Sequence, residues 1–317
     1  MKISVVLPLY NKAPYLQETL DSVFAQTYPI FEVIVVDDGS SDESIDIARR
    51  YHGVTVVTQT NQGPSAARNF GVRLAQGDWI ALLDADDIWV PEHLSSLVAL
   101  SKNTSEASVL GSGYRFAYAP ARDSKQESKG EQSNISDMHL VSAKLAYKYA
   151  GELSDYFAAC CHFDLPLTAS SVLIQRSNLL AVKGFNTAMR TGEDQDLWAR
   201  LAVRSFIAVT PQETVTYRIG HRSALGHHIV LEPAPQLNTY HTLLAQPQCS
   251  RYHTSIRYLA HLSVLSCVKQ RLQNGQRRAA RTLLKTHWAV QADHWYFAAL
   301  LLSVMPSGLV KRILACA

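Results

Sequence analysis

The sequence predicts an α/β fold in which a sheet flanked by helices is followed by an all-helical extension. Over the first third of the chain, short apolar runs alternate with segments whose apolar residues recur at helical spacing, which is typical of parallel βαβ units. Polar clusters follow several apolar runs, and the pattern turns all-helical after Pro233-Ala234-Pro235. A chain of 317 residues, 47% hydrophobic and 18% charged, can bury a core large enough for this arrangement.

The first third contains four segments that fit strands, over residues 3–7, 31–36, 54–58 and 79–83, and those over 31–36 and 79–83 fit strands covered on both faces. Helices are expected between them. Pro14 opens the first, and Ser40-x-x-Glu43 has the pattern of a capping box for a second that ends near Tyr51. Gly63-Pro64 begins the third, and Gly77 ends it. These segments predict parallel strands with helices on their faces.

The middle of the chain is less regular. Residues 121–137 are rich in Ser, Lys and Glu and are expected to form an exposed loop, whereas residues 140–159 have the pattern of a helix. Further strands are expected over residues 107–118, 170–175, 206–209 and 214–219, and helices over residues 177–182 and from Asp194. We therefore expect one domain with two halves, residues 1–115 and 116–232, followed by an extension over residues 233–317.

An acidic run follows the fourth strand directly, at Asp84-Ala85-Asp86-Asp87. The carboxyl ends of strands are where open α/β sheets bind ligands, and Asp84 and Asp86, one residue apart, can share a hard cation. Asp87 is interpreted as the residue that leads into and caps the helix opened by Pro91. The alternative for the whole run is a solvated acidic turn, since isolated Asp-x-Asp sequences are common.

Other polar residues are expected at the same edge of the sheet. Tyr10 can flank a base, Asp38 suits a ribose hydroxyl or a base N–H, and Arg68 suits a phosphate or a base carbonyl. Each has a structural alternative. A tyrosine at a strand end commonly only packs, the Asp37-Asp38 pair can form a turn with a helix cap, and Arg68 can form a salt bridge to Asp84.

Together these segments resemble the family 2 glycosyltransferases, which have the GT-A fold, a Rossmann-like mixed sheet that binds nucleotide-diphospho-sugars. The resemblance covers residues 1 to about 222 and is densest in the first 95. It rests on five motifs in order: Ile3-Ser4-Val5-Val6-Leu7-Pro8-Leu9-Tyr10-Asn11, Val35-Val36-Asp37-Asp38-Gly39-Ser40, Gly63-Pro64-Ser65-Ala66-Ala67-Arg68-Asn69, Leu83-Asp84-Ala85-Asp86-Asp87 and Gly192-Glu193-Asp194-Gln195-Asp196-Leu197-Trp198.

The resemblance implies an inverting, metal-dependent transfer of one sugar from a nucleotide-diphospho-sugar, with a UDP-sugar as the expected donor. Asp194 would be the general base, because one carboxylate near the acceptor hydroxyl suffices. Glu193 would orient it or bind acceptor; alternatively, both acids only start a helix, whose dipole favours them. The donor contacts implied are Pro8, Tyr10, Asp38, Arg68, Asp84 and His221, and Asp86 with Asp84 would hold Mg²⁺ or Mn²⁺.

The implied acceptor is a hydroxyl of a glycan or a lipid-linked sugar, in cell-surface polysaccharide or glycolipid synthesis. Processive synthases of the family carry a Gln-x-x-Arg-Trp motif and transmembrane helices, and neither is found here, which favours addition of a single sugar. Two alternatives remain open. A nucleotidyltransferase should have a Gly-rich phosphate loop after the first strand, where this chain has no glycine. A non-catalytic sugar-nucleotide-binding protein would not need Asp194.

Charge separates the extension from the rest of the chain. The net charge is +3; residues 233–317 hold ten Lys/Arg and one acid, 10 − 1 = +9, which leaves 3 − 9 = −6 for residues 1–232. Basic and aromatic residues over 250–317 suit an anionic membrane surface or merely a solvated face, and no nucleic-acid module is recognisable. Five unevenly spaced cysteines fit reduced thiols, so a cytoplasmic protein is expected, peripheral on the inner face of the cell membrane if the basic extension binds lipid.

Overall fold

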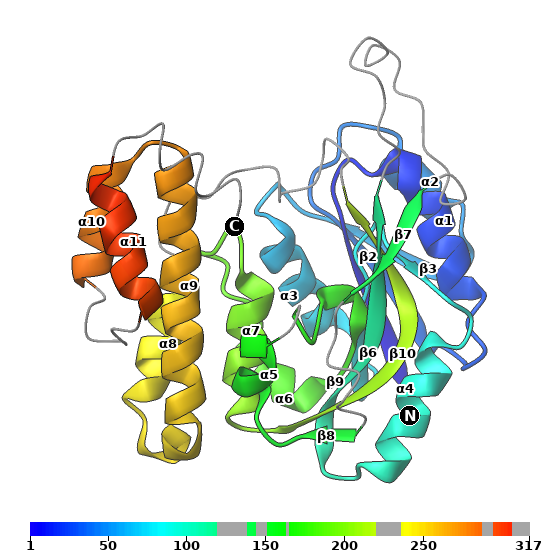
Figure 1. Ribbon diagram of the computed structural model, residues 1–317. Coiled ribbons are helices and arrows are strands. Elements are labelled where there is room, and N and C mark those ends of the chain that lie inside the picture. The colour runs from blue at the N-terminus through cyan, green and yellow to red at the C-terminus, as the bar shows by residue number, and fades with distance from the viewer. Residues whose placement is uncertain (119–137, 144–150, 163–164, 220–235, 287–293, 306–317) are drawn as a thin grey trace. The chain divides into compact units, whose positions relative to one another are not determined.

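The structure is a computed structural model that describes the chain except residues 119–137, 144–150, 163–164, 220–235, 287–293 and 306–317 (Figure 1). The chain divides into two compact units. The first comprises Met1–Tyr156 with Phe163–His227, and the second comprises Phe157–His162 with His228–Ala317. Each unit is described by itself.

Four parallel strands form one half of the sheet in the first unit, in the order β3-β2-β1-β4. They are β1 (Ile3–Leu9), β2 (Glu32–Asp37), β3 (Val54–Thr58) and β4 (Trp79–Leu82). The helices between them are α1 (Ala13–Phe24), α2 (Ser44–Arg49) and α3 (Pro64–Leu74). The predicted βαβ units are therefore confirmed.

The other half of the sheet mixes strand directions and continues in the order β9-β6-β10-β5. β9 (Val172–Gln175) runs antiparallel to both β4 and β6 (Ala107–Tyr118), whereas β10 (Phe206–Ile219) is parallel to β6 and antiparallel to β5 (Ile88–Trp89). The remaining elements of the unit are α4 (His93–Asn103), the 3-10 helix η2 (Ala169–Ser171), α6 (Arg176–Ala181) and α7 (Glu193–Ala202). The expected mixed sheet flanked by helices is confirmed.

The core explains why β1 is apolar at every position except Ser4. Alternate residues of a strand point to opposite faces, and Val5 and Leu7 pack in one cluster with Leu16 and Leu20 of α1. The other face meets α3, where a Cβ placed on Gly71 would lie 2.4 Å from the Val6 side chain. Figure 1 shows helices on both sides of the sheet. Because β1 is buried on both faces, apolar residues occupy consecutive positions along it instead of alternating with polar ones.

Two expectations about local structure are wrong. Of the described residues within 140–159, only those of α5 (Tyr156–His162) are helical; β7 (His139–Ser142) pairs with β6, and β8 (Gly151–Leu153) pairs with β10. Open strand edges offer backbone partners, and such tertiary pairing overrides local helical pattern.

The capping box is also absent. Helix α2 begins only at Ser44 and has no side-chain cap, and Ser40 Oγ accepts instead from the backbone N–H of Asn11 at 3.0 Å.

The second unit is helical throughout its described residues, which confirms the predicted extension. It contains α8 (Leu237–Leu244), the 3-10 helix η4 (Pro247–Tyr252), α9 (His253–Gln273), α10 (Arg277–Thr286) and α11 (His294–Val304). Helix α10 buries Ala280, Leu283 and Leu284 at helical spacing. Among the described residues of both units, no helix has the length and apolar character needed to cross a membrane.

Candidate functional site

The candidate site lies at the edge of the sheet where β1, β2 and β4 end. Because these strands are parallel, the residues that follow them come together. The Asp38 N–H donates to Leu9 O at 2.7 Å, and the Leu83 N–H donates to Val6 O at 3.2 Å. From the 3-10 helix η2, which precedes the antiparallel strand β9, Ser170 Oγ accepts from the Asp84 N–H at 3.1 Å. The topology thus places the predicted polar clusters at one edge.

The carboxylates of Asp84 and Asp86 face different cations. Asp84 Oδ1 accepts from Arg68 Nη2 at 2.6 Å, and Asp86 Oδ2 accepts from Lys12 Nζ at 2.5 Å. The Asp86 backbone carbonyl accepts from Arg218 Nη1 at 2.8 Å. The two acids that sequence reasoning assigned to a metal are therefore each bound to a basic side chain in this structure.

Asp87 is buried, and its interpretation as a helix cap is wrong. Its Oδ2 accepts from Ser170 Oγ at 2.5 Å and its Oδ1 from the Arg218 N–H at 3.1 Å. Helix α4 begins only at His93, so Asp87 lies too far away to cap it. Burial, and then the charges of Asp86 and Asp84, raise the pKa of Asp87 well above its ordinary value. Asp87 therefore ties the acidic run to β10 and to the 3-10 helix η2.

Arg68 connects the two ends of the candidate site. Its guanidinium is buried, binds Asp84 as described, donates from Nη1 to Glu193 Oε1 at 3.2 Å, and lies 5.1 Å from the centre of the Phe185 ring. Burial alone would lower the pKa of Arg68, but the charges of Asp84 and Glu193 outweigh it and raise the pKa. The structural alternative for Arg68, a salt bridge to Asp84, is present. Its contact to a nucleotide stays a prediction.

Asp194 lies in the first turn of α7, beside Glu193. Its Oδ1 accepts from the Gln195 N–H at 2.7 Å. Burial raises the pKa of the Asp194 carboxyl to about 6; the Glu193 charge adds to this, while the Gln195 N–H opposes it. A carboxyl with a pKa near neutrality can exchange protons with a ligand at physiological pH. Its role as a base stays a prediction.

The other predicted donor contacts differ in exposure. Tyr10 is 47% exposed and open to a ligand, whereas Pro8 is buried within β1. Asp38 is buried and accepts three hydrogen bonds, from Gln59 Nε2 at 2.7 Å and the N–H groups of Gln62 at 2.8 Å and Gly63 at 2.7 Å. Asp38 thereby fixes the loop before α3. His221 lies outside the described residues.

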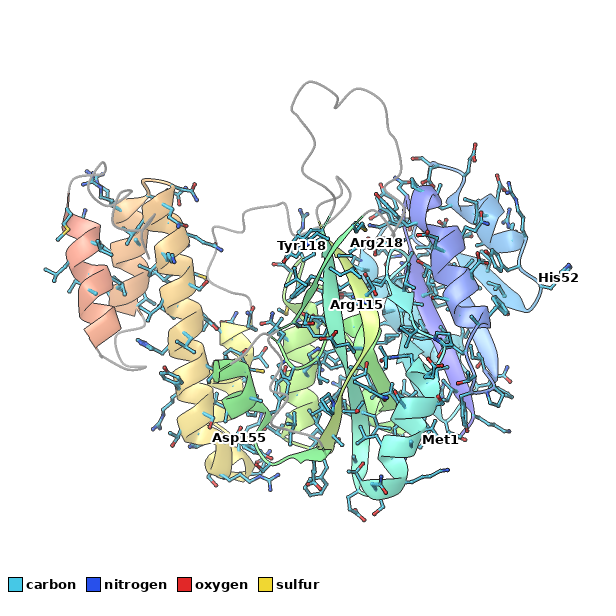
Figure 2. The ribbon with its side chains drawn as sticks, turned by 45° about the vertical axis from the view of Figure 1, so that its right-hand side comes forward. Met1, His52, Arg115, Tyr118, Asp155 and Arg218 are labelled. Carbon is cyan, nitrogen blue, oxygen red and sulfur yellow. The ribbon has the colours of Figure 1, made fainter. Side chains whose placement is uncertain are left out.

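Sequence reasoning missed several residues that surround the acidic run. Lys12 stands directly after the Tyr10-Asn11 pair, so its position next to the end of the first motif was the available signal. Arg218 is buried, pairs with Glu18, and lies 5.2 Å from the centre of the Tyr15 ring. Figure 2 shows Arg218 near Tyr118, at the same end of β10 and β6. No local pattern marked Arg218 or Ser170, because their partners are distant in sequence.

The residues present suit a magnesium or manganese ion bound partly by a substrate. Within the described parts of the chain, no group of three or more His, Cys, Asp or Glu side chains could enclose a metal. Asp84 and Asp86 offer hard carboxylate oxygens at the sheet edge. Mg²⁺ commonly takes one or two carboxylates and completes its shell with substrate phosphates and water. The site therefore fits a cation that binds together with a diphosphate.

Comparisons with known proteins show which proteins this chain is similar to. Residues 4–158 match the sequence model of glycosyl transferase family 2. The chain is 29% identical to an uncharacterized glycosyltransferase of Haemophilus influenzae over 230 residues, 69% of this chain and 68% of the relative. It is 37% identical to the succinoglycan biosynthesis protein ExoW of Rhizobium meliloti over 149 residues, 42% of this chain and 47% of that one.

Other relatives are longer. A Rickettsia felis protein described as an uncharacterized glycosyltransferase is 27% identical over 221 residues, 69% of this chain but only 33% of its own length. Among solved structures, Staphylococcus aureus TarS 1–349 in complex with UDP-GlcNAc is 18% identical, with a TM-score of 0.66 over 98% of this chain and 91% of that chain. The Pyrobaculum calidifontis mannosyltransferase PcManGT, in complex with GDP-Man and Mn²⁺, has a TM-score of 0.59 at 18% identity, over 99% and 84%. These structures establish a shared GT-A fold.

Proposed function

Because the chain carries a glycosyl transferase family 2 domain over residues 4–158, we propose that it is an inverting, metal-dependent glycosyltransferase. It would move one sugar from a nucleotide-diphospho-sugar to a hydroxyl of a glycan or lipid-linked acceptor. The observation that carries this proposal is the position of Arg68, which contacts Asp84 at the end of β4 and Glu193 at the start of α7. Arg68 therefore joins the sheet edge proposed for the donor to the acidic pair proposed for the acceptor, Glu193 and Asp194.

The donor is proposed to bind along the ends of β1, β2 and β4. Tyr10, exposed at the end of β1, would flank the base, and a UDP-sugar is the expected donor. Asp38 and Arg68 already have protein partners, so their contribution to donor binding would come from shaping the pocket or from exchanging partners. Pro8 would act through the backbone of β1.

A divalent cation held by Asp86, with Asp84 as a second ligand, would offset the negative charge that develops on the leaving diphosphate. Mn²⁺ or Mg²⁺ fits the two-carboxylate donor set described above. Structural neighbours support this choice, since one of them is described in complex with Mn²⁺ and a sugar nucleotide.

Asp194 is proposed to act as the general base. It would take the proton of the acceptor hydroxyl while that oxygen forms a bond to the anomeric carbon. The bond from this carbon to the diphosphate oxygen breaks at the same time, and its electron pair leaves with the diphosphate. Single displacement on the opposite face inverts the configuration. A carboxyl with a pKa raised to about 6 is ionised at pH 7 and basic enough for this task.

The acceptor is proposed to be presented at an anionic membrane surface, which would make the protein a peripheral one on the cytoplasmic face. Over residues 236–286 of the second unit, the chain has eight Lys/Arg and no Asp or Glu. Arg278 and Lys285 are exposed on α10, whose Ala280, Leu283 and Leu284 are buried. Such a helix can lie on anionic lipid through its basic face.

Flotation with vesicles tests the membrane proposal. The full chain should float with vesicles that contain anionic lipid and remain behind with neutral ones, and Arg278→Glu with Lys285→Glu should abolish flotation. Arg73→Glu with Lys102→Glu, two exposed basic positions of the first unit, form the control. Equal flotation of all variants, or none, contradicts the proposal.

A donor panel tests the proposed activity. Thermal melting of the protein with nucleotide-diphospho-sugars, with and without Mn²⁺, should show a rise in Tm for one donor in the presence of metal, because a ligand that binds the native state stabilises it. Asp194→Asn should keep this shift and lose transfer by about 10²–10⁴-fold. Absence of a shift with every donor, or full transfer by the variant, would refute the assignment.

A further inference from the structure

We propose that Lys12 is an exchangeable counterion of Asp86: its ammonium holds the carboxylate until a divalent cation binds there, and then moves to the diphosphate of the donor. This inference rests on the proposed function and assigns a role to a residue outside the predicted site. Its starting observation is the 2.5 Å contact between Lys12 Nζ and Asp86 Oδ2, with only 14% and 13% of the two side chains exposed.

The backbone at Lys12 is fixed, whereas the side chain is a long stem with several rotatable bonds. The Lys12 N–H donates to Ser44 Oγ at 2.8 Å, and the preceding Asn11, at a φ of 50°, donates its N–H to Ser40 Oγ at 3.0 Å. The ammonium, in contrast, is a compact charge on a flexible four-carbon stem. Its root is therefore held at the end of β1, beside the expected donor, and rotation about the stem can change its partner.

Asp86 differs from Asp84 in this respect. The partner of Asp84 is Arg68, a buried guanidinium that also binds Glu193 and lies over the Phe185 ring. Removing Arg68 from Asp84 would disturb all these contacts. The backbone of Asp86 is held by Arg218, so its carboxylate stays in position when its ammonium partner leaves. We therefore place the exchange at Asp86, whose ammonium partner is carried on a flexible stem.

Charge gives the exchange its direction. An ammonium supplies one positive charge and three N–H donors but no acceptor, so it neutralises one carboxylate and cannot remain close to a divalent cation without repulsion. A diphosphate that arrives with the cation brings several negative oxygens, which are suitable partners for the displaced ammonium. Binding of cation and donor would then be coupled through Lys12, which opposes the cation alone and favours the complex with the diphosphate.

Mn²⁺ binding and nucleotide binding by Lys12→Met test the proposal, since this change removes the charge and keeps most of the stem. Mn²⁺ is titrated alone, by the electron paramagnetic resonance signal of the free ion, and a nucleoside diphosphate is then titrated calorimetrically in the presence of Mn²⁺. We expect Lys12→Met to bind Mn²⁺ alone at least about fivefold more tightly than the wild type. This factor corresponds to the interaction of two unit charges at contact distance in water. The variant should bind the nucleotide at least about fivefold more weakly, by the same estimate.

The opposite signs of these two changes distinguish an exchangeable counterion from a structural lysine. Lys12→Arg, which keeps the charge, should remain near the wild type in Mn²⁺ affinity, and Lys102→Met, at an exposed lysine of α4, is the control. Weaker or unchanged Mn²⁺ binding by Lys12→Met, or unchanged nucleotide binding, overturns the proposal. If Lys12→Met does not fold, Lys12→Gln takes its place. Because Mn²⁺ alone is measured without any sugar donor, failure of the donor panel refutes the function separately.

Discussion

Neighbouring acids of one run have different environments, and these environments decide what each can do. Asp87 is buried with Ser170 and the backbone of Arg218, so it serves the fold. Asp84 is held by the guanidinium of Arg68, whereas Asp86 is bound by the ammonium of Lys12. Asp194 has a pKa raised to about 6. At the scale of single residues, we therefore propose that identical side chains divide between structure, metal binding and proton transfer.

The raised pKa of Asp194 predicts the pH dependence of transfer. A base works only as the carboxylate, so kcat/KM should be level above pH 6 and fall as the pH drops through about 6, the pKa of this carboxyl. Glu193→Gln removes a like charge that helps to raise the pKa, and should move the midpoint to lower pH. A pH profile of kcat/KM for both proteins checks this. A profile of the wild type that stays level down to pH 4.5 would contradict the assignment.

Arg68 is expected to be the residue of the site that matters most for stability. Arg68→Met leaves Asp84 and Glu193 without their shared partner, and breaking a buried ion pair in this way costs about 3–5 kcal/mol. Urea unfolding measures the loss, with Arg73→Met, an exposed arginine on the same helix, as the control. Adding Glu193→Gln to Arg68→Met should recover part of the stability. Equal stability of the Arg68 and Arg73 variants would show that the bridge contributes nothing.

Helix α3 shows how one element organises the site. Arg68 points to Asp84 and Glu193, and the next residue, Asn69, exchanges two hydrogen bonds of 2.8 Å with the backbone of Phe185. Gly71, one turn later, brings the helix close to Val6 of β1. The motif that begins at Gly63-Pro64 therefore places a helix so near the sheet that its first half can join segments more than a hundred residues apart.

Gly71→Ala tests this close approach. The new Cβ would lie 2.4 Å from Val6 Cγ1 and 3.2 Å from Val36 Cγ2, so the helix must move away from the sheet. Overpacking of this kind costs about 1–3 kcal/mol, and the shift should also weaken donor binding because it displaces Arg68. Unfolding by urea and a donor titration measure the two effects. Gly71→Ala combined with Val6→Ala, which makes room, should restore most of both; no recovery would argue against the packing explanation.

For the whole molecule, local pattern was sufficient to predict the first half of the sheet and the helical extension. The four parallel strands and their helices follow from apolar runs and Pro or Gly signals, and residues 54–58 and 107–118 form strands with the predicted bounds. Strands β7 and β8 were not predictable in this way, because their backbone partners belong to β6 and β10 and nothing local favours a strand there.

The candidate site was predictable only in part for the same reason. Motif order and strand ends indicated the acidic run, Arg68 and Asp194. Lys12, Ser170 and Arg218 were missed, because each acts on Asp84, Asp86 or Asp87 across distances of 74 to 132 residues in sequence. Such contacts depend on the completed sheet and leave no periodic signal in the chain.

The central claim is that the edge formed by β1, β2 and β4 binds a nucleotide-diphospho-sugar through a cation at Asp86. Calorimetric titration of the sugar nucleotide selected by the donor panel, in the presence of Mn²⁺, tests it most directly, with the wild type, Asp86→Ala and the control Asp46→Ala, an exposed acid of α2. We predict binding by the wild type and by Asp46→Ala, and loss of binding by a folded Asp86→Ala. Equal binding by Asp86→Ala and the wild type would contradict the claim.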